Sequence, residues 1–373
     1  MSIRFRTICA AAALAPLALL AACGSSGSTS GSSGSASASA TASASSGSGS
    51  TTLSETGSTL LFPLFGAWQA AYATAVPAVT ITSGGTGSGT GIADAATGTV
   101  TIGASDAYLS AAQLAQYKGL INIPLAVAAV NVNYNVPGVT KPINLNGKVL
   151  AQIYAGKITT WNNAAITAIN PGVTLPNLKI VTLHRADSSG STFLFTSYLN
   201  DQDPADWSSS NVGTTITWPS APGSLAETGS GGMVSGCGST KGCIAYIGIS
   251  YAAKATAASL GTAALANKAG KFVSASTASI NAALATFSGS TPKTGAQSLI
   301  DTTAPTGYPI INYEYAIVKT TQPSAATASA LKAFLKWTIT TGASATYLGA
   351  VGFEPLPANV TTIAQNEISS ISG

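Results

Sequence analysis

Residues 184–199, HRADSSGSTFLFTSYL, combine the residue types that bind a small anion. Arg185 and Asp187 come first, a run of small hydroxyl residues with Gly190 follows, and apolar residues at helical spacing come last. A hydroxyl-rich turn that enters a helix presents free backbone N–H groups and a positive dipole end. Arg185 adds a planar fork of donors, with Asp187 as its orienting partner. The pattern predicts an oxyanion site; the alternative is a plain surface ion pair.

Two further stretches have the same chemistry. They are GSTLLFPLFGAWQAAY at 57–72 and GTGSGTGIADAA at 85–96. In the second, Ser88 is the candidate hydroxyl donor, and the glycines let the backbone approach an anion closely. A dinucleotide-binding loop is the alternative for 85–91, but its glycine spacing is poor. Three such turns and one arginine predict a cage of donors around a small tetrahedral oxyanion.

Asp106, in GASDAYL, decides which oxyanion fits. An acid in an anion site is unfavourable unless the anion carries a proton that it can donate. Phosphate at neutral pH carries one or two protons, whereas sulfate carries none. A site built to pair a ligand hydroxyl can reject the analogue without it by about 10⁴–10⁵. Asp106 therefore predicts phosphate; the alternative is a helix-capping aspartate.

The composition bounds the class of protein. The chain has 373 residues, enough for two domains, with 46% apolar and 8% charged residues and a formal net charge of +4. This weak, scattered charge does not predict nucleic-acid binding. His184 is the single histidine, so no Ser-His-Asp set or metal cluster is expected. We expect His184 to be structural, the protein not to be an enzyme, and no cofactor or metal to be needed.

The N-terminus reads as a targeting segment. Arg4 and Arg6 precede an apolar stretch at 8–20 that is too short to span a bilayer, and Leu-Ala-Ala-Cys23 follows. This resembles a bacterial lipoprotein signal, with 1–22 removed and Cys23 lipidated, typically with palmitate. An ordinary secretory peptide is the alternative. Residues 23–52 are rich in Gly, Ser and Ala and predict a flexible tether. The signal, the lipidated cysteine and the tether together predict a protein anchored at the extracytoplasmic face of the cell membrane.

Cys237 and Cys243 lie six residues apart in a Gly-rich segment. In an exported domain, two cysteines this close most simply form one disulfide bond. A metal site, the alternative, needs more ligands than this segment offers.

Periodicity predicts alternating strands and helices. Strands are expected at 76–82, 99–104, 121–134, 178–183, 243–252 and 309–319, and helices at 58–74, from 91, at 146–156 and at 326–340. This order predicts an α/β fold with a parallel or mixed sheet. A second lobe entered near 125 and left near 308 implies a two-crossing hinge. We expect lobe I at 53–125 and 309–373, lobe II at 126–308, and a ligand cleft between them.

Together these motifs resemble the phosphate-binding lipoproteins of bacterial high-affinity phosphate ABC importers. The likeness runs from about 55 to 357. It is carried by ETGSTLLFPLF, GTGSGTGI, IGASDAYLS, NGKVLAQIYAGKITTWNN, HRADSSGSTFLFTSYL and YPIINYEYAIV. The segment GGMVSGCGSTKGCIAYIGIS resembles the actinobacterial branch. The resemblance implies a two-lobed periplasmic-binding-protein type II fold.

The resemblance also implies a ligand set. The phosphate-binding residues it implies are Ser58, Thr59, the backbone of Leu60, Ser88, Asp106, Arg185, Ser189, Gly190 and Ser191. Many members of the family have threonine or aspartate where Ser191 stands, and glycine where Ser188 stands. A serine keeps a hydroxyl donor, so phosphate remains the expected ligand.

The expected function is that of a monomeric extracytoplasmic receptor. It would capture inorganic phosphate and deliver it to the transmembrane permease of an ABC importer. The alternatives are a phosphatase or phosphotransferase that uses the same oxyanion cage, and a surface adhesin that borrows the fold.

Overall fold

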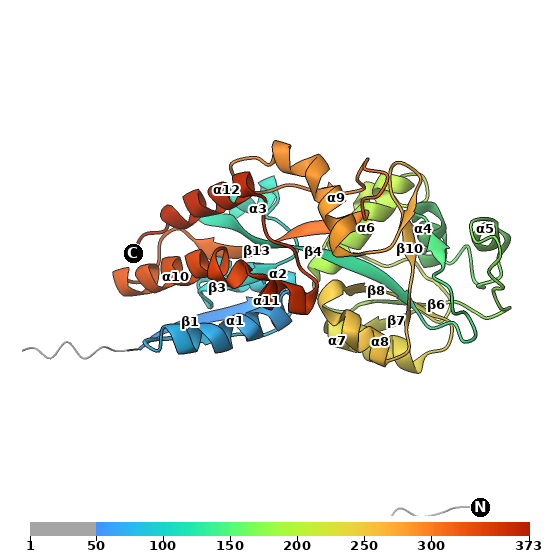
Figure 1. Cartoon of the computed structure of the whole chain (residues 1–373), viewed down its shortest axis with the longest axis horizontal. Coiled ribbons are helices and arrows are strands. Elements are labelled where there is room, and N and C mark those ends of the chain that lie inside the picture. The colour runs from blue at the N-terminus through green and yellow to red at the C-terminus, as the bar shows by residue number, and fades with distance from the viewer. Residues whose placement is uncertain (1–49) are drawn as a thin grey trace, which may run out of the picture. The chain divides into compact units, whose positions relative to one another are not determined.

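A computed structural model describes residues 50–373 of the chain. The expected signal peptide, Cys23 and most of the tether lie outside the described residues. Figure 1 shows two α/β lobes, with β4 (Leu120–Tyr134) and β13 (Ile310–Lys319) running between them. The two-lobed fold and the mixed α/β class predicted from the sequence are confirmed.

One mixed sheet runs through both lobes, in the order β2-β1-β3-β13-β4-β8-β6-β7, with β12 paired to β13 and β9 to β4. Its remaining strands are β1 (Thr51–Gly57), β2 (Val79–Thr82), β3 (Ile102–Ser105), β6 (Val181–Arg185), β7 (Leu225–Glu227), β8 (Cys243–Gly248), β9 (Gly261–Thr262) and β12 (Leu299–Ile300). A small second sheet contains β5 (Asn144–Leu145), β10 (Ala264–Ala266) and β11 (Phe272–Val273). Within each lobe the strands that carry the candidate site are parallel: β1 with β3, and β6 with β8.

The strand β4 links the two lobes. It pairs antiparallel with β13 as far as Ala129, with a register shift at Glu314/Tyr315, and with β8 from Val130 onward. Residues 123–130 of β4 are all apolar and buried. Such a run is typical of a strand that is covered on both faces. The expected boundary at 125/126 falls inside β4, and the division into 53–125 with 309–373 and 126–308 stays a prediction.

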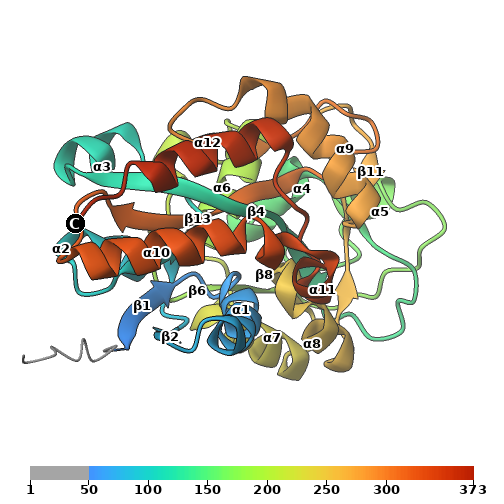
Figure 2. The ribbon, with the colours of Figure 1, turned by 60° about the vertical axis from the view of Figure 1, so that its left-hand side comes forward.

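Helices cover the sheet faces. In lobe I they are α1 (Phe62–Ala75), α2 (Ser88–Thr97), α3 (Ala111–Gln116), α10 (Ala325–Thr338), α11 (Ala345–Leu348) and α12 (Ala358–Ser369). In lobe II they are α4 (Gly147–Tyr154), α5 (Ala164–Ala168), α6 (Gly190–Gln202), α7 (Gly229–Ser239), α8 (Ala252–Ala257) and α9 (Thr277–Phe287). Short 3₁₀ turns occur at Ser209–Asn211, Ile249–Tyr251, Ser288–Ser290, Thr341–Ala343 and Gly349–Val351. Figure 2 shows α10 and α12 side by side, where α10 packs on β1 and α12 on β4.

Most expected elements exist, with shifted ends. The expected helix at 58–74 begins later, at Phe62, because Pro63 has no N–H to continue a helical ladder from Thr59 and the Leu61 N–H bonds instead to the Ser58 hydroxyl. The expected strand at 243–252 ends at Gly248, where a 3₁₀ turn begins. Strand β1 was not expected, since its sequence TTLSETG is polar and its pairing with β2 and β3 is non-local.

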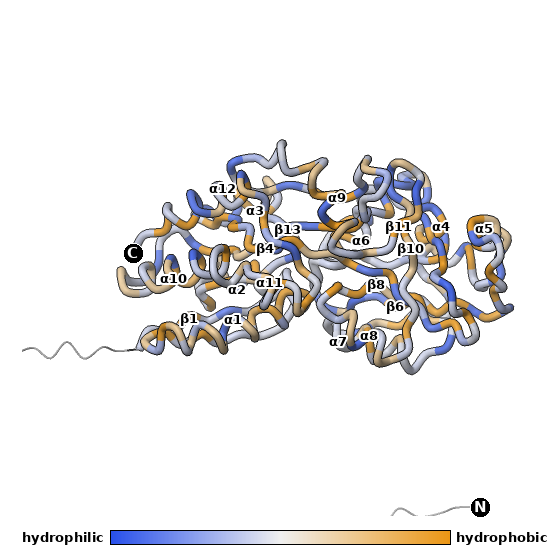
Figure 3. The backbone as a smooth tube through the Cα atoms, viewed as in Figure 1, coloured by the Kyte–Doolittle hydropathy of each residue, from blue (hydrophilic) through white to orange (hydrophobic). Residues whose placement is uncertain are grey.

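Aromatic residues fill the core of each lobe. In lobe I, Tyr72 of α1 packs edge-on against Phe334 of α10, with ring centroids 5.0 Å apart. In lobe II, Phe195 of α6 stacks on Tyr246 of β8 at 4.6 Å. Figure 3 shows apolar segments in both lobes. The packing of Phe195 on Tyr246 holds α6 against β8, and so sets the position of the turn at the start of α6.

A disulfide bond joins Cys237 at the end of α7 to Cys243 at the start of β8, with the two Cα atoms 5.3 Å apart. This confirms the expected pairing. Among residues 50–373, the helices are all too short or too polar to cross a membrane.

Candidate functional site

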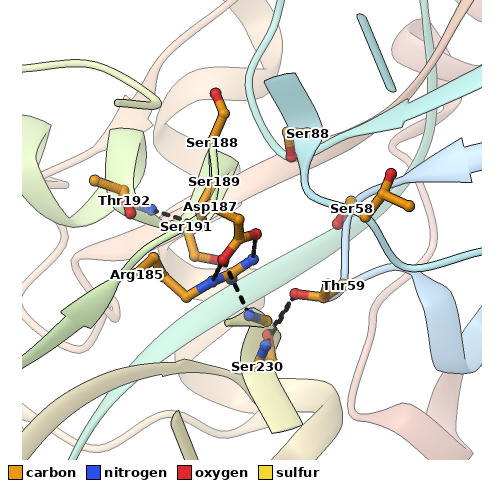
Figure 4. Close-up of polar contacts among 12 residues, drawn as sticks. Ser58, Thr59, Ser88, Arg185, Asp187, Ser188, Ser189, Ser191, Thr192 and Ser230 are labelled. Carbon is orange, nitrogen blue, oxygen red and sulfur yellow. Dashed lines mark hydrogen bonds and ion pairs between the residues drawn. The ribbon is translucent and has the colours of Figure 1, made fainter. Parts of the chain in front are cut away.

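Three turns and the residue that follows β3 meet beside β4 and β13. Lobe I contributes the turn after β1, the start of α2 and the residue after β3. Lobe II contributes the turn between β6 and α6. Figure 4 shows Ser58, Thr59 and Ser88 on one side and Arg185, Asp187 and the serines of the α6 turn on the other. The structure thus brings together every residue of the expected ligand set, although their role as ligands stays a prediction.

The first turn follows β1. Ser58 is buried, and its Oγ accepts a bond from the Leu61 N–H at 3.0 Å and donates to Asp106. No hydrogen bond to the described residues occupies the backbone N–H groups of Thr59 and Leu60. These two N–H groups are therefore the donors that this turn can offer to an anion.

The second turn places Ser88 at the start of α2. Its buried hydroxyl accepts a bond from the Asp106 N–H at 3.2 Å. Gly87, just before the helix, has φ +99°, and a Cβ there would lie 2.7 Å from an Asp187 carboxylate oxygen. Only glycine permits this close approach of the two lobes.

Asp106 follows β3 and is almost completely buried. Its carboxylate accepts a bond from the Ser58 hydroxyl and another, at 2.7 Å, from the Ser191 hydroxyl of the opposite lobe. Burial raises the pKa of Asp106, while the two hydroxyls and the charge of Arg185 oppose that rise. Each carboxylate oxygen has two lone pairs, so Asp106 can accept a further hydrogen bond from a ligand atom that carries a proton.

Arg185 ends β6 and forms a two-pronged pair with Asp187. Its Nε donates to Oδ1 at 2.7 Å and its Nη2 donates to Oδ2. The Arg185 side chain is 2% exposed and that of Asp187 is 14% exposed, so this is not the surface ion pair of the alternative interpretation. Burial favours the neutral form of Asp187, but Arg185 outweighs it and lowers the pKa of Asp187. The pair leaves the Nη1 protons of Arg185 for a ligand.

The third turn caps α6. Ser189 is the N-cap, and its Oγ accepts from the Thr192 N–H at 3.3 Å. Gly190 and Ser191 begin the helix, where N–H groups have no intrahelical acceptor. A Cβ at Gly190 would lie 2.6 Å from Asp106 Cβ and from Ser88 Oγ, so glycine is required here. The Ser189 N–H is used by the Thr214 carbonyl at 2.8 Å, which leaves its hydroxyl as the donor.

The sequence reasoning missed the start of α7. The Gly229 N–H donates to Asp187 Oδ1 at 3.0 Å, and the Ser230 hydroxyl lies 2.9 Å from the Thr59 hydroxyl in lobe I. The Gly-Ser-Gly-Gly sequence at 229–232, which forms the first turn of α7, resembles the other three turns and is the signal that could have found it.

Tyr246 supports the site from the core. Its hydroxyl accepts from the Arg185 N–H at 2.9 Å and lies 2.7 Å from the Thr192 hydroxyl. The pKa of Tyr246 is raised by burial. The tyrosine therefore fixes the end of β6 relative to the first turn of α6.

His184 takes no part in the cluster. Its ring packs against Trp218 at 4.9 Å, and its Nδ1 lies 3.1 Å from the Ser224 hydroxyl. Within residues 50–373 there is no group of three His, Cys, Asp or Glu side chains that could hold a metal ion. A pocket of about 320 Å³ lies next to the turns, and its lining includes Ala107, Tyr108, Phe193 and Thr214.

Comparisons with known proteins agree with this architecture. The sequence pattern of the PBP superfamily domain matches residues 42–341. The chain is similar to phosphate-binding protein PstS of Xylella fastidiosa, with 33% identity over 83% of each chain. It is also similar to phosphate-binding protein PstS 3 of Mycobacterium leprae, with 32% identity over 82% of this chain and 83% of the relative.

The fold is also similar to that of a high-affinity periplasmic phosphate-binding protein (PfluDING) solved with phosphate bound. The TM-score is 0.67 and the sequence identity 23%, over 84% of this chain and 93% of the other. At this identity the likeness concerns the fold.

Proposed function

This chain belongs to the PBP superfamily, in the family of PstS phosphate-binding proteins, and we propose that it captures inorganic phosphate outside the cytoplasmic membrane and delivers it to the permease of an ABC importer. The observation that carries the proposal is Asp106. A buried carboxylate among hydroxyl and N–H donors, with Arg185 beside it, is suited to an oxyanion that also brings a proton.

The proposed ligand contacts are donors of these turns; the Ser58 and Ser191 hydroxyls, which donate to Asp106 in this structure, would turn to the anion when it binds. On lobe I they are the N–H groups of Thr59 and Leu60 and the hydroxyls of Ser58, Thr59 and Ser88. On lobe II they are Arg185, the hydroxyls of Ser189 and Ser191, and the N–H groups of Gly190 and Ser191. Donors from both lobes mean that the anion would be enclosed only when the lobes are together, where low polarity strengthens each contact.

We also propose that the protein is a receptor and not an enzyme. The relatives are phosphate-binding proteins by name. His184, the one histidine of the sequence, contacts Trp218 and Ser224 and no serine of the turns. Incubation with a chromogenic phosphate ester tests this: turnover that Ser189→Ala abolishes would overturn the receptor assignment.

Anchoring at the membrane through a lipid on Cys23 is a further part of the proposal, supported by the lipoprotein-like signal. Stable anchoring takes about two acyl chains buried in the membrane, and the lipidated cysteine would supply them. Cys23→Ala removes the attachment point and should therefore release the protein into the soluble fraction. We propose a monomer, and we place the chain in the actinobacterial branch on the resemblance of its Cys237–Cys243 segment.

Isothermal titration of the purified exported domain is the direct test. Phosphate should bind with a stoichiometry of one per chain, and sulfate at equal concentration should give much weaker heat. Equal affinity for the two anions, or no binding of either to a folded protein, would refute the proposal.

A further inference from the structure

Glu314 lies in the middle of β13 and is fully buried. In the antiparallel pairing of β13 with β3, Tyr315 is opposite Ser105 and Ala316 is opposite Ala104. The next residues along the two segments are Glu314 in β13 and Asp106, which directly follows β3, so this register brings the two residues next to each other. Side chains directly opposite each other on antiparallel strands have Cβ atoms about 4.5–5.5 Å apart. A second carboxyl group, that of Glu314, which the sequence analysis did not predict, therefore lies next to Asp106 of the candidate site.

Asn312 connects the two acids. Its Nδ2 donates to Glu314 Oε1 at 2.8 Å and to the Asp106 backbone carbonyl at 3.2 Å. The other Glu314 oxygen, Oε2, accepts no bond from any donor among the described residues. The register and the shared Asn312 amide bring the buried Glu314 carboxyl close enough to Asp106 for the two groups to influence each other's charge. Two ionised carboxylates have no proton to share, so a hydrogen bond between them requires that one is protonated.

The surroundings decide which acid holds the proton. Asp106 receives bonds from the Ser58 and Ser191 hydroxyls and lies in the field of Arg185, all of which favour its charged form. Glu314 receives one bond, from a neutral amide. Burial and the negative charge of Asp106 raise the pKa of Glu314 well above its ordinary value. Two like charges in such a site do not both ionise, and the less stabilised one takes the proton.

We propose that Glu314 is a neutral, protonated positioning residue that donates a hydrogen bond to Asp106 and so keeps Asp106 ionised and oriented toward the ligand. The part that concerns ligand choice rests on the proposed function. An ionised Asp106 accepts the proton of phosphate and repels sulfate, whereas a protonated Asp106 would donate to sulfate. The other ionisable groups near the pair are Arg185 from β6, whose charge acts on Asp106, and Tyr315, the neighbour of Glu314 in β13, whose side chain lies on the other face of the strand.

Infrared spectroscopy tests the proton without any ligand. The wild-type spectrum minus that of Glu314→Gln, at neutral pH, should contain the carbonyl band of a protonated carboxylic acid. Labelling with ¹³C-glutamate should shift this band, and labelling with ¹³C-aspartate should leave it in place. Absence of the band, or a shift with aspartate labelling, overturns the proposal.

Titration of phosphate and sulfate tests the consequence for binding. Glu314→Gln keeps a neutral donor and should bind phosphate within about threefold of wild type, whereas Glu314→Leu removes the donor. In Glu314→Leu, sulfate should gain and the phosphate-to-sulfate affinity ratio should fall at least about tenfold, the value of one charge-assisted hydrogen bond. An unchanged ratio in folded Glu314→Leu, or an equal fall in Glu314→Gln, contradicts the proposal.

Glu354→Gln is the matched control. Glu354 is also buried and also accepts one bond from an asparagine, Asn281 Nδ2 at 3.2 Å, but it lies outside the cluster. The phosphate-to-sulfate affinity ratio of Glu354→Gln should equal that of wild type. If Glu314→Leu does not fold, the infrared result with Glu314→Gln still decides. If wild type binds no phosphate, the proposed function fails, while the infrared band reports on Glu314 independently.

Discussion

The Ser191 hydroxyl donates to the Asp106 carboxylate over 2.7 Å, from the first turn of α6 in lobe II to the end of β3 in lobe I. This bond makes Asp106 a contact between the lobes as well as a candidate ligand residue. A ligand that both accepts from Ser191 and donates to Asp106 can join the same two elements. Phosphate has both kinds of oxygen at neutral pH, and this is why recognition and lobe closure can depend on one carboxylate.

Asp106→Asn should lower the selectivity for phosphate over sulfate. The amide oxygen can still accept from phosphate, so phosphate binding falls modestly. Sulfate gains, because the repulsion disappears and the new N–H can serve a bare oxygen. We expect the affinity ratio to shrink by at least about tenfold, mostly from the sulfate side, as measured by titration of both anions. A ratio equal to that of wild type would remove the physical basis for assigning phosphate.

Arg185→Ala should weaken all anions alike. It removes the buried cation and leaves Asp187 without its partner, so phosphate and sulfate should each lose roughly ten- to a hundredfold in affinity. Arg185→Lys keeps the charge without the planar fork of donors, so its affinity for both anions should fall between those of wild type and Arg185→Ala. Lys157→Ala, which breaks the exposed pair with Asp206, is the control and should bind normally. Selective loss of phosphate alone in Arg185→Ala would contradict a shared charge role.

Local sequence predicted the turns well and the long-range contacts poorly. The predicted hydroxyl-rich turn does lead into a helix, and Ser189 caps α6 because a hydroxyl before a helix satisfies a free N–H group locally. The bond between Thr59 and Ser230 joins residues 171 positions apart, and no local pattern specifies which turn in lobe II meets Thr59. The start of α7 was therefore missed although its own sequence resembles the other turns.

Glu314 shows a second limit. An acid inside the apolar segment PIINYEYAIV is visible in the sequence, but its meaning depends on register. A shift of one residue between β13 and β3 would turn Glu314 to the other face of the sheet. Only the pairing of Tyr315 with Ser105 places Glu314 beside Asp106.

Ser230→Ala should weaken phosphate binding through the contact between the lobes. The Ser230 hydroxyl and N–H both bond to the Thr59 hydroxyl, at 2.9 and 3.1 Å. Loss of one hydroxyl bond should cost about two- to tenfold in affinity, seen mainly as faster phosphate release. Ser235→Ala on the exposed face of the same helix is the control, since its hydroxyl bonds only to the Gly231 carbonyl. Equal affinities of the two variants would show that the contact does not contribute to binding.

Glu55 in β1 should make the stability of the protein fall as the pH rises. Both of its oxygens are buried and form no hydrogen bond within the described residues, and burial raises its pKa from 4.5 to about 8, although the nearby polar backbone of Gly84 opposes part of that rise. Between these values the unfolded chain has lost the proton that the folded protein keeps, so the free energy of unfolding decreases with pH. The contribution is complete below about 4.5 and lost by about 8.

Glu55→Gln cannot ionise and should be more stable than wild type at pH 8 by up to a few kcal/mol, with little difference at acidic pH. Glu55→Asp keeps an ionisable group and should keep the pH-dependent decline. Urea unfolding of the three proteins across this pH range measures the effect. If the difference between Glu55→Gln and wild type does not grow from acidic to alkaline pH, then Glu55 is not a buried neutral acid in the folded protein.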